Sequence, residues 1–157
     1  MALFNNYPLI SAMVAMFFAQ LLKFPVNAII NRKIEPMIIF SNGGMPSSHS
    51  AFVSALTVAI GIQYGVGTTY FAISFVFAAI TMWDAAGIRY QASKHAQVLN
   101  VLIKDFQLLI EQVKYKSSNP KEFSGSPLKE LLGHKPFEVF IGSIFGLLIA
   151  FIVKAFY

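Results

Sequence analysis

Apolar residues along this chain gather in four stretches that are separated by more polar segments. The stretches cover residues 7–30, 48–66, 68–88 and 136–157. A membrane-spanning helix needs about 20 predominantly apolar residues, within a range of roughly 17–25. The outer two stretches reach this length by themselves, and the inner two reach it only with their polar ends included. The pattern predicts about four transmembrane helices in one domain of residues 1–157, with a partly re-entrant course for one inner stretch as the alternative.

A different pattern occupies residues 91–115, where apolar and polar residues alternate at helical spacing. The apolar members are Val98, Leu99, Leu102, Phe106, Leu109, Ile110 and Val113. Recurrence every three or four positions is the period of an amphipathic helix, which packs on the bundle or lies at the membrane interface. Residues 116–127 are rich in Ser, Lys, Pro and Gly and predict an exposed loop.

Composition agrees with a lipid environment. Hydrophobic residues make up 56% of the chain and charged residues only 12%, whereas a soluble domain carries about 25% charged residues. The fold class expected is all-α: an integral membrane helical bundle of about four spans plus one amphipathic cytoplasmic or interfacial helix.

The absence of cysteine excludes disulfides, thiolate metal sites and cysteine nucleophiles. The first apolar stretch has no basic start or clear cleavage site, so we expect it to be retained.

Positive charge indicates how the chain lies in the cell membrane. Ten of the twelve Lys and Arg residues fall in two connections, after the first and the third apolar stretch. Cytoplasmic connections carry an excess of Lys and Arg, so this side is expected to be cytoplasmic and both termini outside. The net charge is +5, but the Lys and Arg residues form no basic run. The charge therefore indicates anionic lipid and not nucleic acid as the partner.

Most of the unusual polar residues belong to that same side. They are Lys23, Arg32, His49, Asp84, Arg89, His134 and Glu138, each beside the end of an apolar stretch. Ionisable residues in or next to membrane segments are costly and indicate a functional site by default. The alternative for each residue taken alone is an interfacial charge that marks a helix end.

The sequence SNGGMPSSHSA at 41–51 is the strongest local feature. Its two glycines permit a close approach of the backbone, and Pro46 suits the first turn of a helix. The amides and hydroxyls that follow would form an anion site at a helix N-terminus, where phosphate is the usual ligand. His49 can exchange a proton near neutral pH in such a site. A plain helix cap is the alternative, although a cap requires only one serine.

Four segments together carry a family resemblance. They are GGMPSSHSA at 43–51, DAAGIR at 84–89, QVLN at 97–100 and ELLGHKPFEV at 130–139. With them, nearly the whole chain resembles the divergent branch of the type 2 phosphatidic acid phosphatase (PAP2) superfamily, which is related to acid phosphatases and vanadium haloperoxidases. The resemblance implies phosphoryl transfer through a phosphohistidine.

The resemblance also implies roles for individual residues. The superfamily pattern Pro-Ser-Gly-His is similar to Pro-Ser-Ser-His here, which implies His49 as the general acid and Ser47, with Ser48 in place of glycine, as a phosphate ligand. The pattern His-x-x-x-Asp is similar to His134-x-x-x-Glu138, which implies a nucleophile and the carboxylate that orients it.

Residue chemistry leaves the choice of nucleophile open. Pro136 disfavours helix at the residue before it, so His134 is expected to precede a helix and Glu138 to reach back from its first turn. An ordinary turn with an acidic residue near a helix start is the alternative. His95 competes, because it follows Arg89 at the superfamily's spacing, but no carboxylate lies four residues beyond it.

Further residues are expected to hold the phosphate or support the site. Arg89 suits phosphate oxygens geometrically, and Asp84 either positions Arg89 or forms a structural ion pair with it. The superfamily's Lys and Arg lie seven apart, whereas Lys23 and Arg32 lie nine apart, half a turn out of phase in a regular helix. A break at Pro25 would bring both to the site. Snorkelling is the alternative for Lys23.

These observations predict a membrane phosphatase that hydrolyses a lipid phosphate or pyrophosphate, with Asn100 of the QVLN segment as a supporting residue. Lipid-phosphate binding or transport without hydrolysis is the alternative function, and a structural membrane subunit is a third. No metal or cofactor is expected, and vanadate is expected to act as a phosphate mimic. The substrate and the oligomeric state stay open at this point.

Overall fold

The computed structural model describes residues 5–32, 41, 43–114, 128 and 133–157. Five helices follow one another: α1 (Tyr7–Asn31), α2 (Ser48–Tyr64), α3 (Thr69–Ala86), α4 (Ile88–Lys114) and α5 (Pro136–Phe156). No strand occurs among the described residues, so the predicted all-α class is confirmed. The predicted loop at 116–127 lies outside the described residues.

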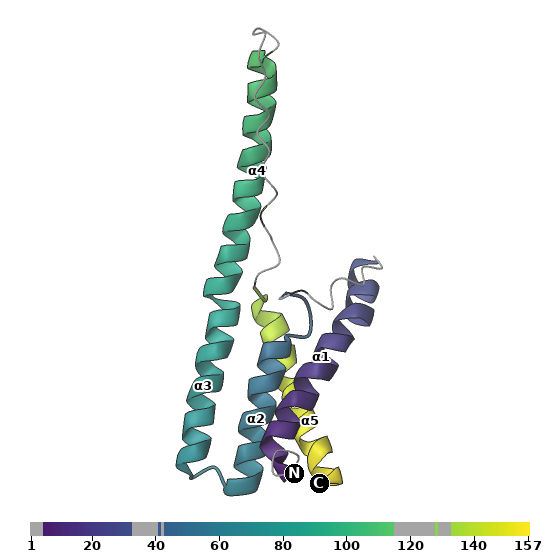
Figure 1. The fold of residues 1–157 in the computed structure, drawn as a ribbon, viewed down its shortest axis with the longest axis vertical. Helices are drawn as coiled ribbons and strands as arrows, with labels where there is room; N and C mark the ends of the chain where they lie inside the picture. The colour runs from purple at the N-terminus through teal and green to yellow at the C-terminus, as the bar shows by residue number, and fades with distance from the viewer. Residues whose placement is uncertain (1–4, 33–40, 42, 115–127, 129–132) are drawn as a thin grey trace.

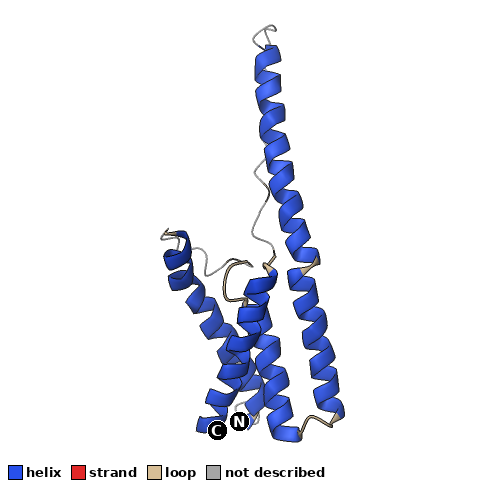
Figure 2. Cartoon of the chain, turned by 180° about the vertical axis from the view of Figure 1, so that it is seen from behind, coloured by secondary structure: helices blue, strands red, loops and turns tan. Residues whose placement is uncertain are grey.

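Four of the helices lie side by side, and the fifth extends beyond them. Helix α2 contacts α1, α3 and α5, and α1 also packs along α5. Helix α4 continues in nearly the direction of α3 and projects away from the bundle (Figures 1 and 2), and among the helices it contacts only α3. The amphipathic helix that the sequence predicts is therefore present, but it neither packs along the bundle nor lies across its end.

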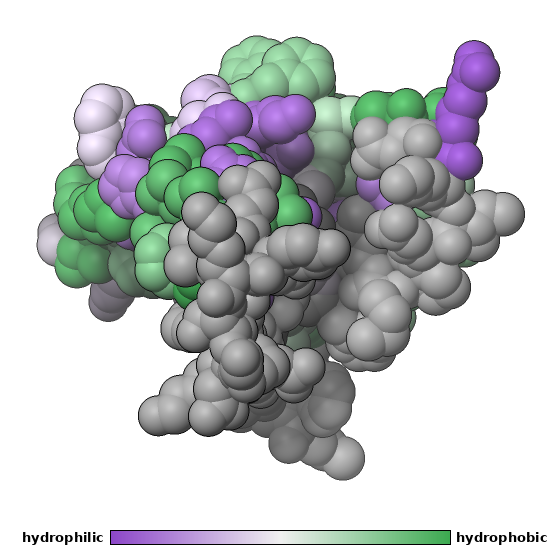
Figure 3. Space-filling view, turned by 90° about the horizontal axis from the view of Figure 1, so that it is seen from above, coloured by the Kyte–Doolittle hydropathy of each residue, from purple (hydrophilic) through white to green (hydrophobic). Residues whose placement is uncertain are grey.

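Three helical segments are long and apolar enough to cross a membrane. They are Tyr7–Ile30, Thr69–Ile110 and Pro136–Phe156, the second of which joins α3 to α4. Many large apolar side chains on these helices are exposed, Trp83 at 80% and Ile73 at 64% among them, and Figure 3 shows hydrophobic surface beside hydrophilic surface. The protein is thus a multi-pass helical membrane protein. Helix α2 has only 17 residues, so its crossing of the bilayer stays a prediction.

Small residues allow the helices to approach closely. The buried core consists largely of alanines: Ala15, Ala19, Ala51, Ala55, Ala59 and Ala150. Between α2 and α5 the contact is closer still, because a Cβ at Gly142 would lie 2.5 Å from the Ser47 oxygen and one at Gly146 would lie 2.2 Å from the Ala51 oxygen. Lipid tails are as apolar as leucine, so helices in a membrane associate through such close packing and through interhelical hydrogen bonds.

Hydrogen bonds between helices occur alongside these contacts. The Ser54 hydroxyl donates to the Ser143 carbonyl of α5 at 2.8 Å. The Tyr7 hydroxyl donates to the Ala150 carbonyl at 2.7 Å, which ties the start of α1 to the end of α5. Both chain termini therefore lie at the same end of the bundle (Figure 1).

Replacement of Gly146 by alanine is expected to destabilise the bundle. The added methyl must push α5 away from the Ala51 carbonyl, and overpacking of this kind costs about 1–3 kcal/mol. Unfolding in detergent measures the effect. Gly67→Ala is the matched control, because nothing lies within 4 Å of the Cβ position at Gly67. Equal stability of the two variants would contradict the close-contact account.

Candidate functional site

The N-termini of helices α2 and α5 meet at one end of the bundle. The two ends of the chain lie at the opposite end (Figure 1). The Ser47 amide donates to the Glu138 carbonyl at 3.2 Å and joins the two helix starts. The amides of Ser48 and His49, in the first turn of α2, make no hydrogen bond to another described residue. Free first-turn amides and the positive ends of two helix dipoles favour an anion at this place.

Helix α2 begins at Ser48, as the predicted stretch 48–66 has it, but Pro46 lies before the helix. Ser47 is the N-cap, with extended backbone angles, and its hydroxyl accepts from the Ser50 amide at 3.3 Å and from the Ser50 hydroxyl at 2.9 Å. The prediction that Pro46 occupies the first helical turn is therefore wrong: the serine hydroxyl satisfies a first-turn donor, and the first helical residue is Ser48, two residues after Pro46. Ser48 is buried in that first turn.

The imidazole of His134 is held by Glu138. Its Nδ1 lies 3.2 Å from Glu138 Oε2, and the same oxygen accepts the Lys135 amide at 3.1 Å. Because α5 begins at Pro136, His134 precedes the helix and Glu138 reaches back from the first turn, as the spacing suggested. The His134 amide also donates to the Ala85 carbonyl at 3.2 Å, which ties this segment to the end of α3.

The other ring nitrogen of His134, Nε2, is buried as well. His134 is 2% exposed, and its Nε2 makes no hydrogen bond within the described part of the chain. A carboxylate only accepts, so Nδ1 carries a proton, and in the neutral imidazole Nε2 then carries the lone pair. The ring of His49 lies beside it edge-on, with 6.3 Å between ring centroids. His95, by contrast, is exposed on α4.

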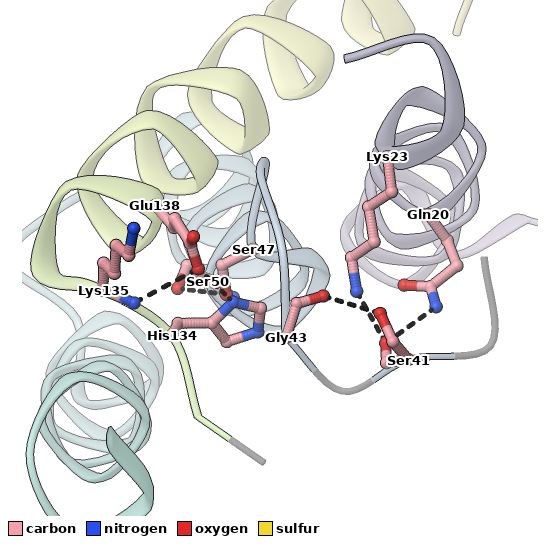
Figure 4. Close-up of polar contacts among 9 residues, drawn as sticks. All are labelled: Gln20, Lys23, Ser41, Gly43, Ser47, Ser50, His134, Lys135 and Glu138. Carbon is pink, nitrogen blue, oxygen red and sulfur yellow. Dashed lines mark hydrogen bonds and ion pairs between the residues drawn. The ribbon is translucent and has the colours of Figure 1, made fainter. Parts of the chain in front are cut away.

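Lys23 lies on the opposite side of the loop that leads into α2 (Figure 4). Its side chain is 1% exposed and donates to the Ser41 carbonyl at 2.9 Å, which Gln20 also contacts at 3.5 Å. The Ser41 hydroxyl donates in turn to the Gly43 carbonyl at 2.8 Å. Lys23 is therefore directed inward and does not snorkel, and it is within range of the charge of Glu138.

The structure separates Arg32 from Lys23. Helix α1 continues through Pro25 to Asn31, so no break brings the two cations together. Arg32 follows the helix as an exposed residue, whereas Lys23 is buried. Nine residues of continuous helix place the two on opposite faces, and Lys23 donates to Ser41, a described residue of the loop before α2.

Arg89 is paired with Asp84. The Arg89 Nε lies 2.6 Å from Asp84 Oδ2, and both side chains are exposed to solvent. Exposed ion pairs contribute only about 0.2–1 kcal/mol, so the guanidinium could exchange this partner for another anion at little cost. The positive charges of Arg89 and Lys23 both act on His49. The role of Arg89 as a phosphate ligand stays a prediction.

Asn100 supports the segment that leads to His134. Its side-chain amide donates to the Leu128 carbonyl at 2.9 Å, and its carbonyl accepts the Leu128 amide at the same distance. Nearer the histidine, a Cβ at Gly133 would lie 2.2 Å from the Arg89 carbonyl carbon, so only glycine fits against the start of α4. Helix α4 thus anchors this segment twice.

Some contributors were not assigned from the sequence. Ser41 and Ser50 belong to the 41–51 motif, which by itself gives them no role, and Gln20 lies within the first apolar stretch. The signal for Gln20 was its position one turn before Lys23, on the same helix face.

Among the described residues, no three His, Asp or Glu side chains lie close enough to hold a metal ion.

The protein is a helical membrane bundle that brings two imidazoles and a carboxylate together at adjacent helix starts. The chain belongs to the divergent PAP2 family, whose model matches residues 4–149. It is similar to a curated protein of Bacillus subtilis (strain 168), "Uncharacterized membrane protein YuiD", with 41% identity over 157 residues that cover 100% of this chain and 99% of that protein. No solved structure matches the chain. The family resemblance of the sequence is confirmed.

Replacement of Asn100 by alanine is expected to loosen the segment before His134. Each of its two hydrogen bonds contributes about 0.5–1.5 kcal/mol, so hydrogen exchange at the Leu128 amide should accelerate on the order of tenfold. Mass spectrometry of the exchanged protein measures this. Gln97→Ala, at an exposed position of the same helix, is the control and should leave the exchange unchanged. An unchanged rate in both variants would show that Asn100 supports nothing here.

Proposed function

We propose that this protein is a membrane phosphatase that transfers the phosphoryl group of a lipid phosphate or pyrophosphate to His134 and then to water. The observation that carries the proposal is the state of His134: a buried imidazole with Nδ1 on a carboxylate and Nε2 unpartnered beside a second imidazole. A histidine polarised in this way is an activated nucleophile.

In the first step, the Nε2 lone pair of His134 attacks phosphorus and the bond from phosphorus to the leaving oxygen breaks. His49 gives its proton to that oxygen, so the product leaves as an alcohol or a phosphate. Glu138 holds the imidazole in the reactive tautomer and stabilises the positive charge that develops on it.

In the second step, water attacks the phosphohistidine. His49, now neutral, accepts the proton of that water, and inorganic phosphate leaves while the His134 lone pair is restored. The equatorial phosphate oxygens carry negative charge throughout, and they would meet the free amides of Ser48 and His49 at the start of α2. The Ser47 hydroxyl, Lys23 and Arg89 are the further donors proposed for these oxygens.

A lipid substrate fits the position of the site. The site lies at one end of a bundle whose helices expose apolar side chains along their length. A phosphate headgroup bound at that end leaves an acyl or isoprenoid chain beside the apolar helix surfaces. The excess of Lys and Arg on this side supports a cytoplasmic position for the site, with both termini outside.

The first test compares the two candidate nucleophiles. Purified protein in detergent should release phosphate from a panel of lipid phosphates and pyrophosphates, and a radiolabelled substrate should leave an acid-labile label on the protein. His134→Ala should abolish both signals, whereas His95→Ala, at an exposed site on α4, should retain both.

Two results would overturn the proposal. If His95→Ala loses activity while His134→Ala keeps it, the nucleophile is His95 and not His134. Lipid-phosphate or vanadate binding without any phosphate release, unchanged by His134→Ala, would favour the binding or transport function that uses the same pocket.

The second test concerns His49 as the general acid. With an alkyl phosphate, His49→Ala should lower phosphate release about 10²–10⁴-fold, because the poor leaving group needs a proton. With p-nitrophenyl phosphate the leaving group needs none, so the burst of p-nitrophenolate from the first turnover should be much less affected. Equal losses with both substrates would remove His49 from the acid role.

A further inference from the structure

Helix α2 carries a row of residues that its neighbouring helices cover only in part. The row, called here the α2 row, consists of His49, Phe52, Leu56 and Ile60. By the helical period, the last three residues point within about 60° of the direction of His49. His49 is exposed and the other three residues are half-buried. The row therefore has an open side over about three turns of α2.

Helices α1 and α3 lie on the two sides of this row. Val53 and Thr57 form one edge: both are buried, and the Thr57 hydroxyl lies 3.1 Å from the Ser74 carbonyl of α3. Ala59 lies at the other edge, in the core cluster that also contains Ala15 of α1. Both α1 and α3 contact α2, but their described residues make no contact with each other. The row is thus open between the two helices.

The far end of the row enters a pocket of about 480 Å³. Leu56, Ile60 and Tyr64 of α2, Tyr70 of α3 and the start of α1 line this pocket. Its volume is in the range of ligand sites, roughly 300–1,000 Å³. Tyr64 and Tyr70 are exposed, with 5.6 Å between ring centroids, and exposed tyrosines on membrane helices mark the interface with water. The pocket therefore lies towards the membrane face opposite to the candidate site.

Hydrocarbon is the chemistry that fits this surface. The pocket lies between two segments that are long and apolar enough to cross a membrane, Tyr7–Ile30 and Thr69–Ile110, so its open side faces lipid chains. Beyond His49, the members of the row are apolar. A molecule with its polar head at His49 would contact apolar side chains over the rest of its length.

The two imidazoles direct such a chain towards the row. In phosphoryl transfer the attacking and leaving atoms lie roughly in line, on opposite sides of phosphorus. His134 precedes α5 and is buried, whereas His49 is exposed at the start of the row. Attack by His134 and protonation by His49 therefore place the leaving oxygen, to which the lipid chain is attached, on the side of the row.

The length of the row determines which chains reach the pocket. Ile60 follows His49 by eleven residues, which is about 16 Å along a helix. An ordinary acyl chain spans one leaflet, or about 15 Å of the hydrocarbon core. A chain of this length just reaches the pocket, and a much shorter chain ends before it.

We propose that the α2 row and the pocket bind the hydrocarbon chain of the substrate, so that the site selects lipid phosphates whose chain is long enough to reach Ile60. This inference rests on the phosphatase function already proposed. Only a long chain gains the contacts of the pocket, because the phosphate fixes the head of the molecule at the other end of the row.

Kinetics with chains of two lengths test the pocket. Octadecyl phosphate and hexyl phosphate have the same leaving-group chemistry and differ in chain length. Ile60→Trp should lower the ratio of their kcat/KM values, octadecyl over hexyl, about tenfold, because the indole occupies the space that the long chain needs. Val76→Trp is the matched control: Val76 is 56% exposed on α3, on the face opposite to Ser74, and the ratio should stay unchanged.

Photo-cross-linking of the natural chain tests the same inference without turnover. Octadecyl phosphonate, which a phosphatase does not hydrolyse, would carry a diazirine at the end of its chain and should label residues 56–70. Octadecanol with the same diazirine is the control. It should label these residues about tenfold less, because it has no phosphonate to hold its head at the anion site.

The outcomes separate this inference from the phosphatase function. Preferential labelling by the phosphonate, with no hydrolysis of either alkyl phosphate, would refute the phosphatase and support the chain site. Hydrolysis with the same ratio in Ile60→Trp and Val76→Trp would support the phosphatase and overturn the chain site. Equal labelling by the phosphonate and the alcohol would also overturn it, since the pocket would then hold bulk lipid.

Discussion

The close contact between α2 and α5 determines most of what this protein can do. Gly142 and Gly146 of α5 lie against the Ser47 and Ala51 carbonyls of α2, with no room for a Cβ. In a lipid environment the hydrophobic effect does not drive helices together, so the short distance between backbones supplies the attraction. The two helices run parallel, and both therefore begin at the same end of the bundle.

That arrangement gives the site its electrostatic character. Two helix N-termini, which carry partial positive charge, lie side by side and are joined by the bond from the Ser47 amide to the Glu138 carbonyl. Lys23 adds a full positive charge in a buried position, where an unpaired ammonium would be costly. The Ser41 carbonyl and the nearby charge of Glu138 compensate for that cost. The site is thus arranged for an anion before any ligand arrives.

The departures from the superfamily patterns have physical explanations in the local structure. His134 lies before α5 and not within it, so its carboxylate partner must reach back past Lys135 and Pro136. The longer side chain of glutamate, with one more methylene than aspartate, suits that distance. Ser48 in place of glycine is tolerated because Ser47 caps α2, so that Ser48 has ordinary helical geometry.

The local features follow from the order of residues along the chain. Lengths of apolar stretches specified the helices, the helical period specified an amphipathic α4, and the four-residue spacing with Pro136 specified the reach of Glu138 back to His134. These depend on neighbours in the chain. Other features could be read only from the packed bundle: His49 and His134 lie ring to ring, Lys23 turns inward while Arg32 does not, Asn100 bonds to Leu128, and α4 projects from the bundle. Those outcomes depend on how closely helices distant in sequence can approach, and that distance is set by glycine and alanine positions whose partners no local pattern identifies.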